Sequence, residues 1–231
     1  MALLEIKNLN KSFDNKEILK DININVSSGK IIGLLGKNGA GKTTFIKLLN
    51  DLLTPSSGEI LVNGMKVGVE SKKIISYLPE RTYLNKQMKV SEVIDFFKDF
   101  YVDFDEEKAK RLLKDLDLDI NEHLAKMSKG MQEKVQLVLV MSRNADLYVL
   151  DEPLGGVDPA TRDYILDTIL SNFNENASVI ISTHLISDIE RILDEVIFID
   201  KGKIVLQSEA DKLRNKEKSS IDEIFRRMFK C

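Results

Sequence analysis

One segment restricts this chain more than any other: an unbroken apolar run at residues 31–35 leads directly into a glycine-rich loop and then a helical pattern. Residues 36–43 read GKNGAGKT, which fits the G-x-x-x-x-G-K-[ST] pattern. The glycines allow the backbone to curl so that successive N–H groups point at phosphate oxygens, and the helix N-terminus adds partial positive charge. The segment therefore predicts a buried strand, a phosphate-binding loop and a helix from about residue 41 to 52.

The residues of this loop have distinct expected roles. Lys42 is the point charge for the β- and γ-phosphates of a nucleoside triphosphate, and the hydroxyl of Thr43 is an expected ligand of Mg²⁺. The other members of the predicted phosphate site are Lys37, Asn38, Gly39, Ala40, Gly41 and Thr44. A chance match in a flexible loop is the alternative, and the position between an apolar strand and a helix argues against it.

Two further apolar runs end in residues suited to phosphate chemistry. Residues 147–150 lead into Asp151 and Glu152. Beside a phosphate loop, we expect Asp151 to contact Mg²⁺, directly or through water, and Glu152 to face the water that attacks the γ-phosphate; alone, the pair would predict a solvated turn. His184 follows the run 179–181 and is expected to hydrogen-bond the γ-phosphate, with a structural histidine as the alternative. These residues predict hydrolysis by in-line attack of water on the γ-phosphorus.

The rest of the chain alternates strand-like and helix-like segments, which predicts a largely parallel sheet covered by helices. The opening differs, because residues 3–9 and 22–26 alternate apolar with polar side chains, as half-exposed antiparallel strands do. Residues 90–141 carry mostly helical spacing and many charges, which predicts a helical insertion. Near the end, Ser220 and Glu223 form a capping-box pattern that predicts the start of a final helix.

This pattern divides the chain into an ATPase domain over residues 1–210, with a helical subdomain at about 85–143, and a C-terminal linker and amphipathic helix over 211–231. The final helix has one apolar stripe, made of Ile221, Ile224, Phe225 and Met228. We expect this stripe to pack on its own domain; a docking or membrane-surface role is the alternative.

Composition excludes several classes of protein. The 34 basic and 37 acidic residues give a net charge of −3, so there is no basic excess for a generic nucleic-acid binder. Cys231 is the only cysteine, which excludes an intramolecular disulfide and a cysteine-based zinc site. Glu5 interrupts the N-terminus before a secretory signal can form, and the most apolar stretch, 135–141, is far below the ~20 residues of a membrane-spanning helix. Any membrane role is therefore expected to depend on another chain.

Taken together, the motifs over about residues 2–210 resemble those of the ATP-binding subunits of ATP-binding-cassette (ABC) transporters. Residues 127–132 read MSKGMQ and are similar to the family signature, commonly LSGGQ. The resemblance places Ser128 and Gly130 against a γ-phosphate, whereas Lys129 and Met131 depart from the pattern. The weight of this match comes from its position shortly before the acidic strand.

Three other positions extend the resemblance. Residues 154–159 read LGGVDP and are similar to the family's D-loop, with Gly155 where serine is common. Phe13 lies where the family places an aromatic ring against adenine, and one more buried aromatic is the alternative. Glu80 takes the place of the Q-loop glutamine, which implies a carboxylate near Mg²⁺. The overall pattern is most similar to a bacterial exporter branch.

The resemblance implies an α/β fold: a P-loop nucleoside triphosphatase core with an N-terminal antiparallel β subdomain and an inserted helical subdomain. It also implies that the chain binds ATP and Mg²⁺ and that two chains, as a homodimer or a heterodimer with another ABC ATPase, close over the nucleotides. The expected partner is a transmembrane permease subunit on a separate chain, with no nucleic acid. The expected location is cytoplasmic and peripheral on the inner face of the cell membrane, and the expected activity is ATP hydrolysis that powers substrate movement, in the export direction.

Alternative functions have less support. A calcium loop at Asp115, Asp117 and Asp119 is rejected because Ile120 and Lys126 stand where that loop needs glycine and glutamate. A GTPase would need an Asn-Lys-x-Asp motif, which is absent, and a small-molecule kinase would have no use for the signature. A soluble mechanical or regulatory ATPase of the same superfamily, not engaged in transport, stays open.

Overall fold

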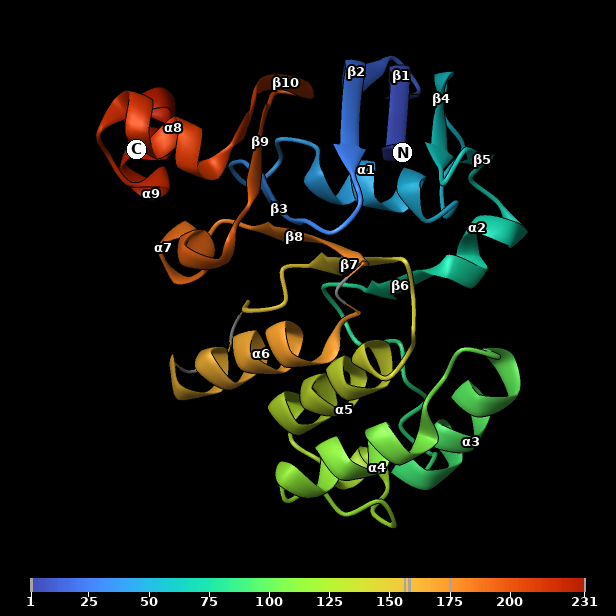
Figure 1. Ribbon diagram of the computed structural model, residues 1–231. Coiled ribbons are helices and arrows are strands. Elements are labelled where there is room, and N and C mark those ends of the chain that lie inside the picture. The colour runs from blue at the N-terminus through green and yellow to red at the C-terminus, as the bar shows by residue number, and fades with distance from the viewer. Residues whose placement is uncertain (1, 156, 158, 175, 231) are drawn as a thin grey trace.

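The computed structural model describes residues 2–155, 157, 159–174 and 176–230 (Figure 1). Within these residues the strands form two sheets, a smaller one ordered β2-β1-β4-β5 and a larger one ordered β10-β9-β3-β8-β7-β6. The strands are β1 (Ala2–Phe13), β2 (Lys16–Ser27), β3 (Ile31–Leu35), β4 (Ser57–Val62), β5 (Met65–Lys66), β6 (Ile75–Leu78), β7 (Leu147–Asp151), β8 (Ser178–Thr183), β9 (Glu195–Asp200) and β10 (Lys203–Glu209). The helices are α1 (Lys42–Leu49), α2 (Val69–Ile74), α3 (Val90–Phe100), α4 (Glu106–Asp115), α5 (Lys129–Met141), α6 (Pro159–Asn172), α7 (Ile186–Ile189), α8 (Ala210–Glu217) and α9 (Ile221–Phe229), with 3₁₀ turns η1 (Leu124–Lys126) and η2 (Glu190–Ile192).

The larger sheet has a parallel centre. Strand β3 pairs in parallel with β8 and β9, and β7 pairs in parallel with β8 and β6. Every residue of β3, β7 and β8 is buried, as expected for strands covered on both faces. Strand β10 returns antiparallel to β9 through the turn after Asp200. This arrangement confirms the predicted α/β fold class.

The smaller sheet is antiparallel and has one face on the core. Strand β1 pairs antiparallel with β2 and β4, and the inward residues Leu4, Ile6 and Ile24 are almost completely buried. Helix α1 lies between the two sheets (Figure 1), and its Phe45 and Ile46 belong to the same hydrophobic cluster as those strand residues. The helix that follows the glycine-rich loop is thereby held on both sides.

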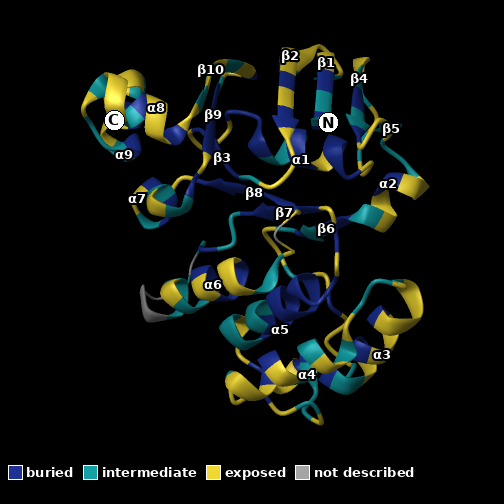
Figure 2. Ribbon diagram, in the orientation of Figure 1, coloured by how far each residue is buried: buried dark blue, intermediate teal, exposed yellow. Residues whose placement is uncertain are grey.

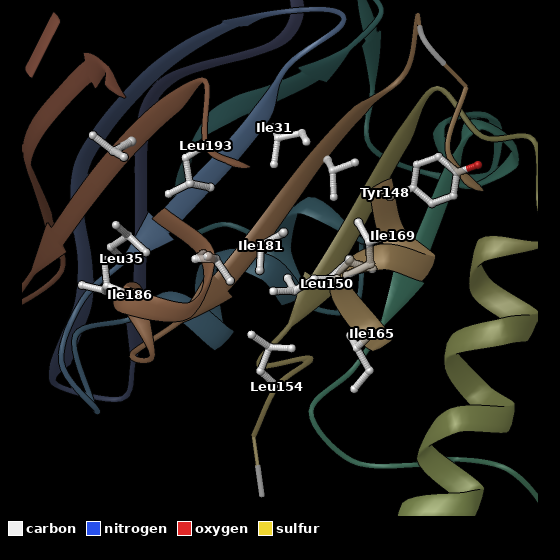
Figure 3. Packing of buried hydrophobic residues seen from close by; sticks show 14 of the residues in the cluster. Ile31, Leu35, Tyr148, Leu150, Leu154, Ile165, Ile169, Ile181, Ile186 and Leu193 are labelled. Carbon is white, nitrogen blue, oxygen red and sulfur yellow. The ribbon is translucent and has the colours of Figure 1, made fainter. Parts of the chain in front are cut away.

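The other face of the larger sheet is covered by α6 and α7. Figure 3 shows Ile165 and Ile169 of α6 packed near Tyr148 and Leu150, and Ile186 of α7 packed near Leu35. Burial of an aliphatic side chain of this size stabilises a fold by roughly 1.5–3 kcal/mol. This cluster fixes the spacing of the parallel strands whose ends form the site.

The predicted helical insertion forms a subdomain of α3, α4 and α5 with its own hydrophobic cluster. Val93 and Phe97 of α3 pack with Leu113 of α4 and Val138 of α5. Figure 2 shows that exposed residues cover the outward faces of α3 and α4, whereas α5 is largely buried toward the sheet. The described residues include no helix that is long and apolar enough to cross a membrane.

The C-terminal segment differs in part from expectation. The stretch expected as a linker contains helix α8, because Ala210 and Leu213 are buried in the cluster under the larger sheet. Helix α9 begins at the predicted capping box: the Ser220 hydroxyl accepts from the Glu223 N–H and the Glu223 carboxylate accepts from the Ser220 N–H, both at 3.1 Å. Three residues of the predicted stripe, Ile221, Ile224 and Phe225, are buried against the domain.

The expectation that the whole stripe packs on its own domain is wrong for its fourth residue: Met228 is 44 % exposed, whereas the next residue, Phe229, packs on Phe198 of β9.

Candidate functional site

The candidate site lies at the carboxyl edge of the parallel strands. The glycine-rich loop follows β3, Asp151 ends β7, and His184 follows β8. Strands β3, β8 and β7 are direct neighbours in the sheet, so their carboxyl ends meet at one edge. Glu80 follows β6 at the same edge, which brings together residues that are more than 140 positions apart in the chain.

The loop after β3 has the curled backbone that a phosphate cradle requires. Gly41 has φ +112°, and a Cβ there would lie 2.8 Å from Leu19 Cδ2, so a larger residue is excluded by conformation and by space. At Gly36 a Cβ would lie 2.5 Å from the Ile199 carbonyl oxygen. Lys42 opens helix α1, and its Nζ donates to the Gly36 carbonyl at 2.7 Å, which ties the two ends of the loop together.

Glu152 connects the loop to His184. Its Oε1 lies 3.4 Å from Lys42 Nζ, and its Oε2 lies 2.9 Å from His184 Nδ1. The Glu152 side chain is 12 % exposed and that of Lys42 only 6 %, so the two charges neutralise each other in a largely dry site. Glu152 also adopts φ +50°, in the left-handed region that non-glycine residues rarely occupy. The Glu152 carboxylate therefore lies beside Lys42, the cation that is expected to bind a γ-phosphate.

Asp151 has one carboxylate oxygen without a partner. Its Oδ1 accepts from the Ser182 hydroxyl at 2.5 Å, whereas the buried Oδ2 accepts no hydrogen bond from the described residues. Burial is the largest influence on the pKa of Asp151 and raises it. The charges of Glu152 and Glu80 raise this pKa further, while the hydroxyls of Ser182 and Thr43 lower it. A buried carboxylate oxygen without a donor is an arrangement that a cation would relieve.

These residues fit a magnesium ion. Thr43, Asp151 and Glu80 supply hydroxyl and carboxylate oxygens, the donors that Mg²⁺ prefers. The described residues hold no cluster of three or more His, Cys, Asp or Glu side chains that could bind a metal ion by themselves. When bound, Mg²⁺ neutralises charge on the β- and γ-phosphate oxygens.

A cavity of about 780 Å³ opens over this edge. Its lining includes predicted site residues, namely Lys37, Asn38, Gly39, Gly41, Lys42, Thr43, Thr44, Glu80, Glu152 and His184. Ala40 and Asp151 lie buried behind the lining. The structure thus gathers at one cavity most of the residues that the sequence analysis placed around a triphosphate.

Phe13 lies outside the lining of this cavity. It is 43 % exposed at the end of β1, where it pairs with Lys16, and the ammonium of Lys11 sits 4.8 Å from the centre of its ring. Lys16 itself lines the cavity. The ring is therefore exposed beside a residue that lines the cavity, and it is not one more buried core aromatic.

Ser128 and Gly130, the two predicted contact residues of the signature-like segment, also lie outside the lining of the cavity. Ser128 is the N-cap of α5, and its hydroxyl accepts from the Met131 N–H at 3.2 Å. Ser128 is exposed, and neither Ser128 nor Gly130 lines the cavity of its own chain, whereas their neighbours Lys129 and Glu133 do. Of the D-loop pattern, Gly156 and Asp158 lie outside the described residues.

Sequence reasoning missed several residues of the site. Ser182 binds Asp151, and Lys16, Ile18, Arg81 and Glu133 complete the lining. The sequence held a signal only for Ser182, a hydroxyl residue near the carboxyl end of the apolar run that leads to His184; its pairing with Asp151 is a matter of sheet register. The others belong to elements whose approach to the loop depends on the tertiary fold.

Comparison with known proteins agrees with this geometry. The family model described as "ABC transporter" matches residues 19–155, more than half of the chain, so the chain belongs to the ABC transporter family. It is an ABC ATPase, the ATP-binding subunit of an ABC transporter.

Two curated relatives cover most of the chain. The "Lantibiotic transport ATP-binding protein SrtF" of Streptococcus pyogenes is 31 % identical over 93 % of this chain and 94 % of its own length. The "Uncharacterized ABC transporter ATP-binding protein MJ1023" of Methanocaldococcus jannaschii is 36 % identical over 87 % of this chain and 76 % of its own length.

Solved structures support the same family and fold. A structure described as "Structure of ATP binding subunit of ABC transporter" is 29 % identical, with a TM-score of 0.86, over 96 % of this chain and 98 % of that one. The fold alone is shared with the dimeric ATP-binding cassette MJ0796 bound to ADP and Pi, which is 20 % identical with a TM-score of 0.78 over 90 % of this chain and 98 % of that one. The predicted family and fold are thereby confirmed.

Proposed function

We propose that two copies of this chain, or one copy and a related ABC ATPase, close over two ATP molecules and by doing so drive substrate export through a separate membrane-spanning partner. The position of Ser128 is the observation that supports this most. Ser128 is exposed and does not belong to the lining of the nucleotide cavity of its own chain. A signature that does not reach the phosphate site of its own chain is suited to the phosphate site of another chain.

In the proposed site, a bound γ-phosphate takes the place of the Glu152 carboxylate beside Lys42. Lys42 lies 3.4 Å from the Glu152 carboxylate, so a bound γ-phosphate competes for the same ammonium. Glu152 is then released to orient water, with His184 as a second contact of the phosphate. The water oxygen forms a bond to the γ-phosphorus, the bond from phosphorus to the β–γ bridging oxygen breaks, and ADP and inorganic phosphate are the products. Thr43, Asp151 and Glu80 hold Mg²⁺ in this proposal.

Hydrolysis removes the charge that joins the two chains, and the helical subdomain is the proposed relay of the resulting motion. On this subdomain Phe96 and Phe100 of α3 are 49 % and 68 % exposed with ring centres 4.6 Å apart, which offers an apolar contact to a partner. The names of two relatives, "Lantibiotic transport ATP-binding protein SrtF" and "SkfA peptide export ATP-binding protein SkfE", support transport and favour the export direction.

The ATP sandwich is tested with Glu152→Gln, which keeps the shape of the side chain but removes its charge. We expect this variant to bind ATP and to accumulate as a dimer with ATP and Mg²⁺, measured by size-exclusion chromatography with light scattering. Adding Ser128→Arg should prevent the dimer but leave ATP binding by the monomer within about twofold, because Ser128 lies outside the cavity of its own chain. Ser171→Arg, at an exposed serine of α6, is the matched control and should dimerise normally.

A Glu152→Gln variant that stays monomeric with saturating ATP and Mg²⁺ would contradict the sandwich. Loss of ATP binding by the Ser128→Arg monomer would instead place Ser128 at the nucleotide of its own chain. The membrane partner is tested separately, by purifying the tagged chain from detergent-solubilised membranes. A co-purifying membrane-spanning protein that stimulates ATP hydrolysis is the expected result, and hydrolysis without any such partner would favour a soluble mechanical or regulatory ATPase.

A further inference from the structure

The end of helix α9 lies directly beside the phosphate loop. Lys37 Nζ donates to the backbone carbonyl of Phe229 at 2.7 Å, across 192 positions of sequence. Lys37 occupies one of the variable positions of the G-x-x-x-x-G-K-[ST] pattern, so nothing in the motif itself requires a lysine there. Its ammonium is directed at the protein's own C-terminal helix.

The carbonyl that Lys37 contacts is held in place by aromatic packing. The rings of Phe225 and Phe229 have centres 4.3 Å apart, and both pack on Phe198 of β9 at 5.4 and 6.1 Å. At the other end of the helix, the Asp222 N–H donates to a Glu190 carboxylate oxygen at 3.1 Å. The helix is thus held by the turn η2 at its start and by β9 at its end, and β9 is the direct neighbour of β3, the strand that leads into the phosphate loop.

The contact is favourable on electrostatic grounds. The last carbonyls of a helix have no partner within the helix and carry its partial negative charge, and a lysine near them stabilises the arrangement. The Lys37 carbonyl in turn accepts from the Ala40 N–H at 3.1 Å, which closes the turn inside the loop. An anchored Lys37 therefore holds the turn whose N–H groups face the phosphates.

A cavity of about 340 Å³ separates the rest of the helix from the loop. Its lining joins the loop residues Gly36, Lys37 and Asn38 with Asp222, Phe225 and Arg226 of α9, and with His184. Because this space is open, the loop is not supported there by close packing. The Lys37 side chain crosses from the loop to the helix and takes the place of that packing.

We propose that α9 is a positioning element of the nucleotide site, and that Lys37 acts by anchoring the phosphate loop to the Phe229 carbonyl rather than by contacting the nucleotide. This rests on the proposed binding of ATP at the loop. Lys37 is a positioning residue here: without the anchor, the loop samples more conformations and ATP binding must order it again. The chemical step, carried by groups on β7 and β8, is not affected.

The proposal is tested with Lys37→Met, which removes the ammonium, and Phe229→Ala, which keeps the carbonyl but removes the ring that fixes it. We expect each to raise the KM for ATP about two- to fivefold, the range for a cation at a helix C-terminus, with kcat within about twofold of the parent. The double variant should be no worse than the more severe single variant, because both remove one contact. Lys37→Arg should restore most of the affinity. Met228→Ala, at an exposed residue of the same helix, is the control and should leave KM unchanged.

Hydrogen exchange of the backbone amides at residues 38–41, measured without nucleotide, tests the anchor independently of ATP hydrolysis. Both variants should exchange faster there than the parent and the Met228→Ala control, while thermal unfolding shows that each is folded. Faster exchange in a chain that fails to hydrolyse ATP would reject the ATPase function and keep the anchor. A raised KM in Lys37→Met with a normal KM and normal exchange in Phe229→Ala would place Lys37 on the nucleotide and overturn the proposal, as would normal exchange in both.

Discussion

Replacing Asp151 by asparagine should stabilise the nucleotide-free protein while abolishing ATP hydrolysis. Asp151 is 1 % exposed, its Oδ2 accepts no hydrogen bond from the described residues, and Glu152 and Glu80 add like charge nearby. Leaving a buried polar group unsatisfied costs roughly 1–3 kcal/mol, more when it is charged. The amide keeps an oxygen for the Ser182 hydroxyl and removes the charge, but its new N–H groups also need partners. We therefore expect a net gain of about 1–2 kcal/mol.

This gain corresponds to a rise of about 2–8 °C in Tm for a chain of this length. The measurement is calorimetric unfolding without nucleotide and with a chelator, at pH 7.5. Asp167→Asn is the matched control: Asp167 is an exposed residue of α6, and its replacement should change the free energy of unfolding by less than about 0.5 kcal/mol. Turnover measured with ATP and Mg²⁺ should be lost in Asp151→Asn and normal in the control.

The stabilisation should depend on pH with a definite sign. The folded protein raises the pKa of Asp151 above its ordinary value, so the folded state holds the proton more tightly than the unfolded chain does. The cost of the charged carboxylate is absent below the ordinary pKa, near 4, grows as the pH rises from there to the raised pKa, and is constant above it. The Tm difference between variant and parent should therefore be largest at neutral pH and shrink toward pH 4. An equal or lower Tm of the variant at pH 7.5, or a difference that persists unchanged in acid, would refute the reasoning.

Two other substitutions test the rim of the site and the support of the helical subdomain. Phe13→Ala should raise the KM for ATP severalfold with little change in kcat. Stacking of a base on an aromatic ring contributes about 1–3 kcal/mol, and its loss affects binding rather than the chemical step. An unchanged KM in steady-state assays would show that Phe13 does not contact adenine. Arg143→Met should lower the free energy of unfolding by about 2–4 kcal/mol, measured by urea titration. The buried guanidinium donates to the carbonyls of Ile75 and Lys73 and to the Asp103 carboxylate, and these three groups would lose their donor. A loss below about 1 kcal/mol would show that water replaces those contacts.

Local patterns in the sequence identified the parts of this site that adjoin each other along the chain. The apolar run before Gly36 could be interpreted because a strand buried on both faces tolerates only apolar side chains, and β3 is entirely buried. The start of α9 could also be predicted, since Ser220 and Glu223 cap the helix by contacts between residues only three positions apart. The exposure of Met228 could not be predicted in this way, because only the packing of α9 on β9 decides that Phe229 rather than Met228 meets the core.

The electrostatic state of the site followed from the fold rather than from any motif. The sequence predicts that Glu152 faces the attacking water, but it does not predict that the Glu152 carboxylate lies between Lys42 and His184. No motif predicts a role for Arg143. It is nevertheless only 3 % exposed, and it connects the segment after α5 to strand β6 by donating to the Ile75 carbonyl. A pattern of residue types indicates which functional groups a position carries, but it does not indicate which residue that position contacts in the folded protein.

The sequence by itself determined the class of chemistry, through the loop around Lys42, the acids after β7 and the signature-like segment, because glycine conformations, strand burial and capping are short-range requirements. Only the tertiary structure decided which charges pair, that Ser128 lies outside the cavity of its own chain, and that Lys37 contacts the end of helix α9 at Phe229. Contacts of this kind depend on sheet order and register, which bring the edges of distant strands together, and no spacing along the chain encodes them.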